Sequence, residues 1–317
     1  MPPGLRKTKD TQPVHSVSAP RQFLSAIDKI TLAYCAWFII YMTVGIFLDR
    51  AINAGIHLPL YLLIVAFVLL LALAERKLDL SAKPWLLQAL RFVRGIYPVF
   101  LFAYYYSSLR SVSLIIFPEW LDPWFMDMDS KIWGYLPSLE WGRRCSQFFF
   151  QELFHFAYFC YYPLIVGLPL YLYLKNKPAF KELIFNITFV FYACYIFYSI
   201  FPVVGGRFHT ESYRLSQAFR GGIFTRIMAF IYNHSGHWGG AFPSSHVAIA
   251  VVLTIAGFKF TGKWGYLFAV ISVFLSVATV YCHYHWFVDA VAGLFTGILG
   301  YFAANWTRSK LERDPIP

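Results

Sequence analysis

The chain has 317 residues, of which 58% are hydrophobic, 21% are aromatic and only 14% are charged. A soluble domain covers its surface with far more charge, so this composition excludes the ordinary water-soluble classes and indicates a membrane protein. The formal net charge is +11, but Lys and Arg stand in short clusters between apolar runs and form no single basic face. We therefore expect no nucleic-acid partner.

The chain is expected to begin with a cytoplasmic tail over residues 1–29. Basic and acidic residues are mixed in this stretch, and no clear small-residue cleavage site accompanies the first apolar run, which starts near Ile30. The first run is therefore predicted to stay in the protein as a membrane span.

Apolar runs long enough to cross the hydrocarbon core as helices recur along the whole chain. The sequence predicts about eight such spans, at residues 31–48, 57–74, 93–109, 151–173, 183–202, 244–260, 264–282 and 286–304. The expected fold class is an all-α polytopic membrane protein.

The positive charges outside these spans gather on one side of the membrane. They are Arg76, Lys77, Lys83, Lys175, Lys177, Lys181, Lys259, Lys263, Arg308, Lys310 and Arg313, together with those of the N-terminal stretch. Because cytoplasmic loops are enriched in Lys and Arg, both termini are predicted to be cytoplasmic. Segment 110–150 falls on the other side and mixes tryptophans with acidic residues, which is typical of a helix in the membrane interface. It could form a lid or a lateral lipid entrance.

Residues 239–246, Gly-Gly-Ala-Phe-Pro-Ser-Ser-His, are a glycine-rich loop that leads into an apolar helix. A helix N-terminus offers free N–H groups and partial positive charge, and Ser244 and Ser245 would add hydroxyl groups, so an anion such as phosphate could bind there. His246 would stand beside that anion. A plain helix cap and a polar interface histidine are the structural alternatives.

A second polar motif, residues 281–289, joins two predicted spans. It contains His285 and Asp289, four residues apart, which share one face on a helix that begins near Tyr284. Asp289 would then orient the imidazole and leave its other nitrogen nucleophilic. Alternatively, Asp289 pairs with an arginine or is hydrated at the bilayer surface, and His285 belongs to the aromatic belt.

The predicted topology brings these motifs to the same side of the membrane. Two spans separate them, so His246 and His285 must both face the extracytoplasmic side. Arg207 follows another outward-running span, and its guanidinium is a further candidate to bind the same anion.

These motifs resemble the type 2 phosphatidic acid phosphatase superfamily, whose signatures are K-x6-R-P, P-S-G-H and S-R-x5-H-x3-D on a six-helix core. Residues 243–246 match the second signature with Ser245 in place of Gly, and residues 285–289 match the H-x3-D of the third. The chain departs at Thr279, which replaces the arginine of the third signature, and at Ile200 and Phe208, which replace the Lys and Pro of the first. Similar departures are found in the inositol phosphorylceramide synthase branch.

The resemblance implies a six-helix catalytic core over residues 93–305. An extra helix pair and its cytoplasmic connection over 30–92 would precede the core, and a cytoplasmic tail over 306–317 would follow it. His285 would be the nucleophile that forms a phosphohistidine, Asp289 would orient it, and His246 would be the general acid. The phosphate would be bound by Arg207, Ser244, Ser245 and His283. No metal and no cofactor is implied.

The expected function is hydrolysis of a lipid phosphate or pyrophosphate on the extracytoplasmic face. The alternative is a phosphotransferase that passes a phosphoryl-headgroup to a second membrane lipid, since both reactions use the same residues. A transporter is a third hypothesis, but its ionisable residues would be expected near the bilayer midplane. The sequence predicts neither the lipid nor the oligomeric state.

Overall fold

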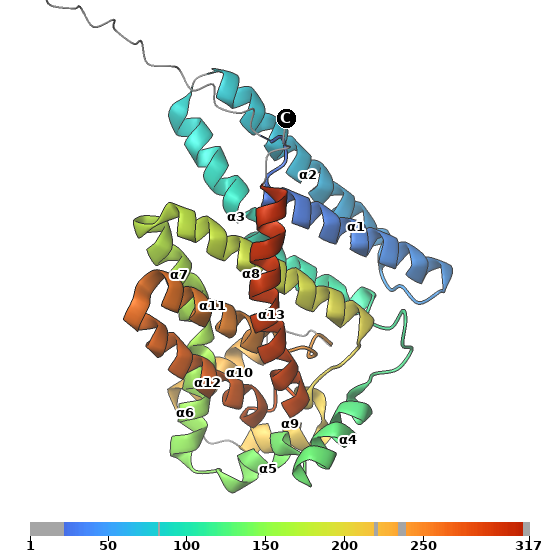
Figure 1. The fold of residues 1–317 in the computed structure, drawn as a ribbon. Coiled ribbons are helices and arrows are strands. Elements are labelled where there is room, and N and C mark those ends of the chain that lie inside the picture. Colours follow the sequence, from blue (N-terminus) through green and yellow to red (C-terminus); the bar gives the residue numbers. More distant parts are fainter. Residues whose placement is uncertain (1–21, 82, 219–220, 234–238, 313–317) are drawn as a thin grey trace, which may run out of the picture.

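The computed structural model describes residues 22–81, 83–218, 221–233 and 239–312, and within these ranges it is built of helices without a β-strand (Figure 1). Seven stretches among them are long and apolar enough to cross a membrane. The predicted all-α polytopic membrane fold is therefore confirmed. Of the two predicted tails, residues 1–21 and 313–317 lie outside the described ranges.

The apolar stretches correspond closely to the predicted spans. Three of them are single helices near the N-terminus: α1 (Ala26–Phe47), α2 (Ala54–Ser81) and α3 (Pro84–Ser108). Two more single helices are α8 (Lys177–Ile200), in the middle of the chain, and α13 (Phe287–Leu311), near its end. Most extend beyond the predicted spans because their polar ends continue the helix past the apolar run.

Two apolar stretches are divided into shorter helices. The predicted span 151–173 is α6 (Phe148–Phe159) followed by α7 (Tyr161–Lys175). Pro163 has no amide hydrogen to continue the helical ladder, which accounts for the interruption. The stretch Ser245–Tyr281 contains α11 (Ser245–Thr261) and α12 (Gly265–Tyr281), which pack against each other after a reversal at Gly262, where φ is +60°.

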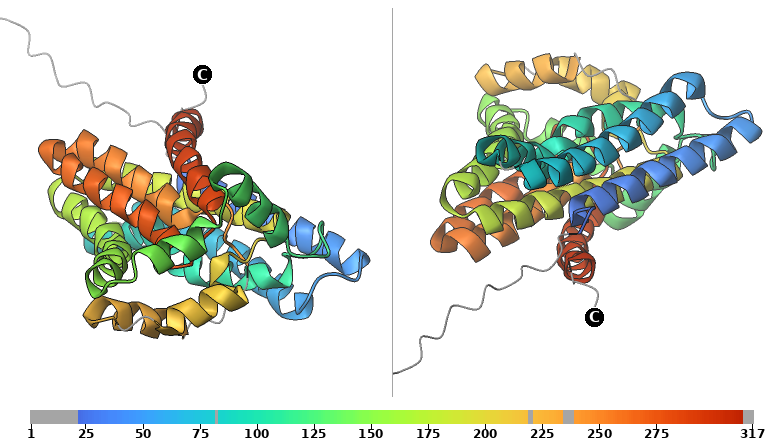
Figure 2. Two further views of the ribbon diagram at one scale, coloured as in Figure 1. Left: turned by 90° about the horizontal axis from the view of Figure 1, so that it is seen from below. Right: turned by 90° about the horizontal axis from the view of Figure 1, so that it is seen from above.

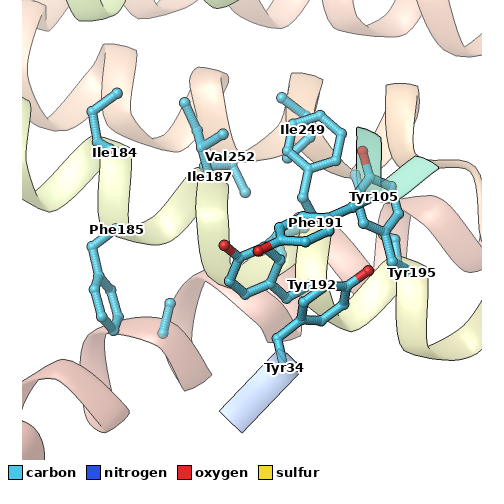
Figure 3. Packing of buried hydrophobic residues seen from close by; sticks show 14 of the residues in the cluster. Tyr34, Tyr105, Ile184, Phe185, Ile187, Phe191, Tyr192, Tyr195, Ile249 and Val252 are labelled. Atoms are coloured by element: carbon cyan, nitrogen blue, oxygen red, sulfur yellow. The ribbon is translucent and has the colours of Figure 1, made fainter. Parts of the chain in front are cut away.

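Helix α8 is the centre of the bundle, packed against α3, α7, α11 and α13. Its residues Tyr192 and Tyr195 contact Tyr34 of α1, whose ring stacks on Tyr192 at a centroid distance of 4.3 Å (Figure 3). This aromatic packing attaches the N-terminal helices to the rest of the bundle, because stacked rings add to the free energy gained from burial.

The two ends of the bundle differ in chemistry. At one end, buried Arg94 pairs with Asp28 and Glu75, and Glu182 pairs with Lys259 and Arg308. The other end is covered by four short helices, α4 (Asp122–Trp133), α5 (Pro137–Arg144), α9 (Thr210–Ala218) and α10 (Ile223–Asn233). Figure 2 shows α4 (green) beside the start of α13 (red). The predicted phosphate-binding and catalytic residues lie at this covered end.

Candidate active site

The loop of residues 239–243, here called the glycine loop, ends at a capped helix. Ser244 is the N-cap of α11, and its Oγ accepts a hydrogen bond from the Val247 N–H at 3.5 Å. The Ser245 N–H donates to the Tyr198 hydroxyl at 3.1 Å, and that hydroxyl donates to the Pro243 carbonyl at 2.9 Å. The predicted helix cap is therefore present, but Ser244 and Ser245 are buried and their N–H groups already have partners, so the start of α11 offers fewer free N–H groups than the sequence suggested. The contribution of Tyr198 was not predicted from the sequence.

Residues 282–286, here called the histidine turn, connect α12 to α13. The N–H groups of Tyr284 and His285 both donate to the Thr279 carbonyl at 3.0 Å, and His283 adopts a positive φ of 63°. Helix α13 begins only at Phe287, so the prediction of a helix from about Tyr284 is wrong. The Thr279 carbonyl, at the site of the arginine in the family signature, instead folds the chain into a turn.

His285 and Asp289 are nevertheless in contact. The His285 Nδ1 lies 3.5 Å from the Asp289 Oδ2, and both side chains are buried. Asp289 reaches this position because the same Oδ2 accepts the Trp286 N–H at 2.8 Å and so caps α13. The contact arises from helix capping, which points the carboxylate back toward the preceding turn.

The burial of His285 decides its charge. Removal from water lowers the pKa of its imidazole to about 4, although a hydrogen bond with the Ala241 carbonyl acts in the opposite direction. His285 is therefore neutral at neutral pH. A neutral imidazole keeps a lone pair on one ring nitrogen, as a nucleophile requires.

His246 lies next to His285, with ring centroids 6.1 Å apart. Its ring also contacts the rings of Tyr158 and Tyr161, at 5.0 and 4.7 Å. The two motifs are held together by the Ser244 N–H, which donates to the Asp289 backbone carbonyl at 2.9 Å. The structure thus brings His246, His285 and Asp289 into one group beside the start of α11.

Residues 203–207, here called the arginine loop, lie against the other two segments. The Ala241 N–H donates to the Val203 carbonyl at 3.0 Å, and a β-carbon on Gly205 would lie 2.5 Å from the Tyr284 carbonyl oxygen. Only glycine fits this close approach, particularly at the Gly205 φ of +85°. The three predicted motifs therefore share one compact site.

Arg207 packs against Tyr232. Its guanidinium donates to the Tyr232 carbonyl and lies over the Tyr232 ring, 4.6 Å from the centroid. It lines a cavity of about 560 Å³ together with His283 and Tyr284, whereas neither His246 nor His285 is among the described residues that line it. The Tyr284 ring, stacked 3.9 Å from Tyr232, stands at the border of this cavity.

His283 is the second predicted phosphate ligand in this cavity. Its Nδ1–H donates to the Ser138 carbonyl, and burial lowers its pKa to about 4. His283 is therefore uncharged at neutral pH, and because its one N–H is used by the Ser138 carbonyl, its Nε2 can only accept a hydrogen bond, as from a protonated phosphate oxygen. In the part of the chain that the structure describes, no group of three His, Cys, Asp or Glu side chains could hold a metal ion.

Sequence reasoning missed two aspartates of α4. Asp122 and Asp129 receive backbone N–H groups from the arginine loop and from the start of α13. Their spacing of seven residues places both on one face of a helix, a pattern that could have indicated a shared role.

Comparisons with known proteins identify the family of this chain. The family model described as the PAP2 superfamily, which is the type 2 phosphatidic acid phosphatase superfamily, matches residues 135–303, more than half of the chain. A PA-phosphatase related-family protein of Dictyostelium discoideum is 33% identical over 55 residues, which is 17% of this chain and 10% of that protein. No solved structure matches the chain. The family match, over a region that contains Arg207, His246, His285 and Asp289, shows that this chain belongs to the PAP2 superfamily.

Proposed function

We propose that the protein is a membrane phosphatase that hydrolyses a lipid phosphate or pyrophosphate through a phosphohistidine on His285. Membership of the PAP2 superfamily supports a phosphatase-like function. The observation that carries the specific proposal is the grouping of His285 with Asp289 at 3.5 Å and with His246 at 6.1 Å between ring centroids.

In the first half-reaction, a nitrogen of neutral His285 attacks phosphorus, and the bond from phosphorus to the leaving oxygen breaks. His246 gives a proton to that oxygen. Asp289 stabilises the positive charge that develops on the His285 ring, because an adjacent carboxylate favours the charged imidazole.

In the second half-reaction, water attacks the phosphohistidine. The water gives a proton to His246, the bond from phosphorus to nitrogen breaks, and phosphate leaves with His285 again neutral. The hydroxyl groups of Ser244 and Ser245, together with the partial positive charge at the start of α11, are proposed to bind the phosphoryl oxygens.

Arg207 and His283 are proposed to bind the same substrate from the adjoining cavity. The guanidinium supplies positive charge, and the neutral His283 can accept a hydrogen bond from a protonated phosphate oxygen, so this cavity suits the outer oxygens of a phosphate or the second phosphate of a pyrophosphate. This scheme requires no metal ion, and we expect the activity to persist in EDTA.

Transfer to a lipid hydroxyl is the second candidate reaction. His285 is only 5% exposed, and the rings of Tyr158 and Tyr161 contact His246, so aromatic side chains cover part of the site. A lipid alcohol would then resolve the phosphohistidine or would accept a phosphoryl-headgroup from the first lipid. The sequence Gly-Ala-Phe-Pro-Ser-x-His at residues 240–246 also resembles the transferase branch.

We further propose that the site faces the extracytoplasmic side and both termini the cytoplasm. The basic residues near the opposite end of the bundle, including Lys259, Lys263 and Lys310, support this orientation. We assign the catalytic core to residues 93–305 and the preceding helix pair to an added element.

The test is phosphate release by the purified protein in detergent from a panel of lipid phosphates and pyrophosphates, with EDTA present. Wild type should release phosphate, the His285→Ala variant should not, and His57→Ala, a histidine of α2 outside the site, should match wild type. If a new lipid appears only when an acceptor lipid is added, and depends on His285, the transferase reading replaces hydrolysis. If no lipid is changed under either condition, a transporter becomes the better hypothesis.

A further inference from the structure

We propose that Asp122 and Asp129 of α4 are positioning residues that hold the arginine loop and the histidine turn in fixed positions relative to each other. The inference rests on the proposed function, since the relative position of these segments matters only if they act on one substrate. The hydrogen bonds that support the inference are present whatever reaction the protein catalyses.

Asp129 caps the helix that follows the proposed nucleophile. Its carboxylate accepts the N–H groups of Phe287 at 2.8 Å and Val288 at 3.0 Å, and its side chain is fully buried. The N–H groups of a first helical turn have no partner within the helix, and a negative charge there also favours the helix dipole. Asp129 thereby fixes the backbone two residues beyond His285.

Asp122 connects two segments of the site through one carboxylate. Its Oδ1 accepts the Gly205 N–H and the indole N–H of Trp286, both at 2.8 Å, and its Oδ2 accepts the Val204 N–H at 2.9 Å. Gly205 lies two residues before Arg207, and Trp286 directly follows His285. The carboxylate therefore links the positions of the phosphate-binding arginine and the nucleophile.

The same face of α4 also reaches the glycine loop. The Phe125 ring lies 4.8 Å from the Phe242 ring, between the contacts made by Asp122 and Asp129. The opposite face exposes Trp124, Met128 and Ile132, a stripe that suits the membrane interface. Helix α4 thus contacts all three segments of the site while lying outside it.

The hydrogen-bond partners of Asp122 and Asp129 determine which substitution tests the positioning role. In the described part of the chain, no Lys or Arg forms an ion pair with Asp122 or Asp129, and the hydrogen bonds that their carboxylates accept come from N–H groups. Asparagine has the same shape but replaces one acceptor oxygen with a donor. That donor would face backbone N–H groups, so Asp→Asn should shift the arginine loop and the histidine turn relative to each other without leaving a cavity.

The test compares Asp129→Asn and Asp122→Asn with Asp127→Asn in the full-length protein in detergent. Asp127 lies on the exposed face of α4 and pairs with Lys131, so it is a control of the same charge and helix. Amide hydrogen exchange is measured over residues 203–207 and 285–290, with the α11–α12 hairpin as an internal check of folding. Phosphate release is measured as kcat and KM separately, and Asp129→Glu tests rescue by a carboxylate.

We expect Asp129→Asn to speed exchange at Phe287 and Val288, and Asp122→Asn to speed it at Val204 and Gly205. Each should lower kcat roughly 10- to 100-fold with little change in KM, because small misplacements of reacting groups are costly. The control should match wild type, and Asp129→Glu should recover part of kcat. Unchanged exchange in both Asn variants, or equal losses in the control, would overturn the proposal.

The two proposals fail in different ways. If wild type releases no phosphate while amide hydrogen exchange in the Asn variants changes as expected, the proposed function is refuted, but the proposal that α4 holds the loops in place is supported. If wild type is active and kcat falls without any change in exchange, the aspartates act on the chemistry directly and positioning is refuted. General loss of protection in the α11–α12 hairpin would show that the aspartates support the whole bundle, which also contradicts the proposal.

Discussion

The backbone of Gly293 in α13 lies so close to Ser244 that a β-carbon there would be 2.5 Å from the Ser244 carbonyl oxygen. One turn further on, a β-carbon on Gly297 would be 2.6 Å from the Ala248 carbonyl oxygen. Small residues four apart allow two membrane helices to approach closely. Asp289 precedes Gly293 by four residues, so the helix face that packs on α11 also positions the His285 partner.

Gly293→Ala should therefore destabilise the protein by about 1–3 kcal/mol, because the added methyl group meets backbone rather than a movable side chain. It should also lower activity by separating His246 from His285. Gly167 of α7 has nothing within 4 Å of its β-carbon position, so Gly167→Ala is the matched control. Thermal unfolding in detergent measures both, and equal melting temperatures for the two variants would contradict the close approach.

Asp289→Asn should reduce kcat roughly 100-fold or more, because the amide cannot stabilise a charged His285 ring as a carboxylate does. Combined with His285→Ala, it should add no further loss, since the two residues act as one unit. Steady-state kinetics of the single and double variants measure this. A double variant far less active than His285→Ala would show that Asp289 has a separate function.

Tyr198→Phe should weaken the start of α11. The hydroxyl accepts the Ser245 N–H and donates to the Pro243 carbonyl, and its loss leaves both buried groups without that partner. We expect a loss of about 1–3 kcal/mol in stability, together with lower phosphate release. Tyr171→Phe, an exposed tyrosine of α7, serves as the control in the same melting experiment. A Tyr198→Phe variant as stable and active as wild type would exclude this role.

On the acid side of the pH profile, activity should rise with pH with a midpoint near 6. Burial raises the pKa of Asp129 to about 6, opposed by the Phe287 and Val288 N–H groups and reinforced by the charge of Asp289. Below that pH Asp129 is protonated and accepts hydrogen bonds poorly. His285, with a pKa of about 4, stays neutral over this range.

Other titratable groups face the same helix start, namely Asp122, Asp289 and His285, and the His209 ring lies 6.1 Å from the Trp286 ring. The pH profile of kcat/KM in Asp129→Asn separates their effects. The variant should lose the midpoint near 6 and keep its lower activity down toward pH 4, whereas Asp127→Asn should keep it. A midpoint that remains near 6 in Asp129→Asn would assign the titration to another group.

The apolar runs predicted the bundle because membrane helices need about 20 apolar residues and every backbone group paired within the helix. The His285 and Asp289 pair was predicted from its spacing, although the helix begins later than expected. The two side chains are still in contact because a carboxylate in the first turn caps the helix and so points back to the preceding residues.

The contribution of α4 could not be predicted in this way. Asp129 binds backbone N–H groups that lie 158 and 159 residues further along the chain, and no local pattern encodes such a pairing. Arg207 lines a cavity whose described lining includes neither His246 nor His285, and this placement depends on tertiary packing in the same way. Local motifs predicted the proposed reacting groups, and long-range packing decides how these side chains meet.

The most direct test of the account is to trap the phosphorylated enzyme. Wild type, His285→Ala and His57→Ala are mixed with phosphatidic acid and with a polyprenyl pyrophosphate, each labelled at the terminal phosphate, and are quenched in alkaline detergent. The account predicts an acid-labile label on wild type and on His57→Ala, and none on His285→Ala. Release of phosphate by wild type without any labelled enzyme, or an equal label on His285→Ala, would contradict a phosphohistidine at His285.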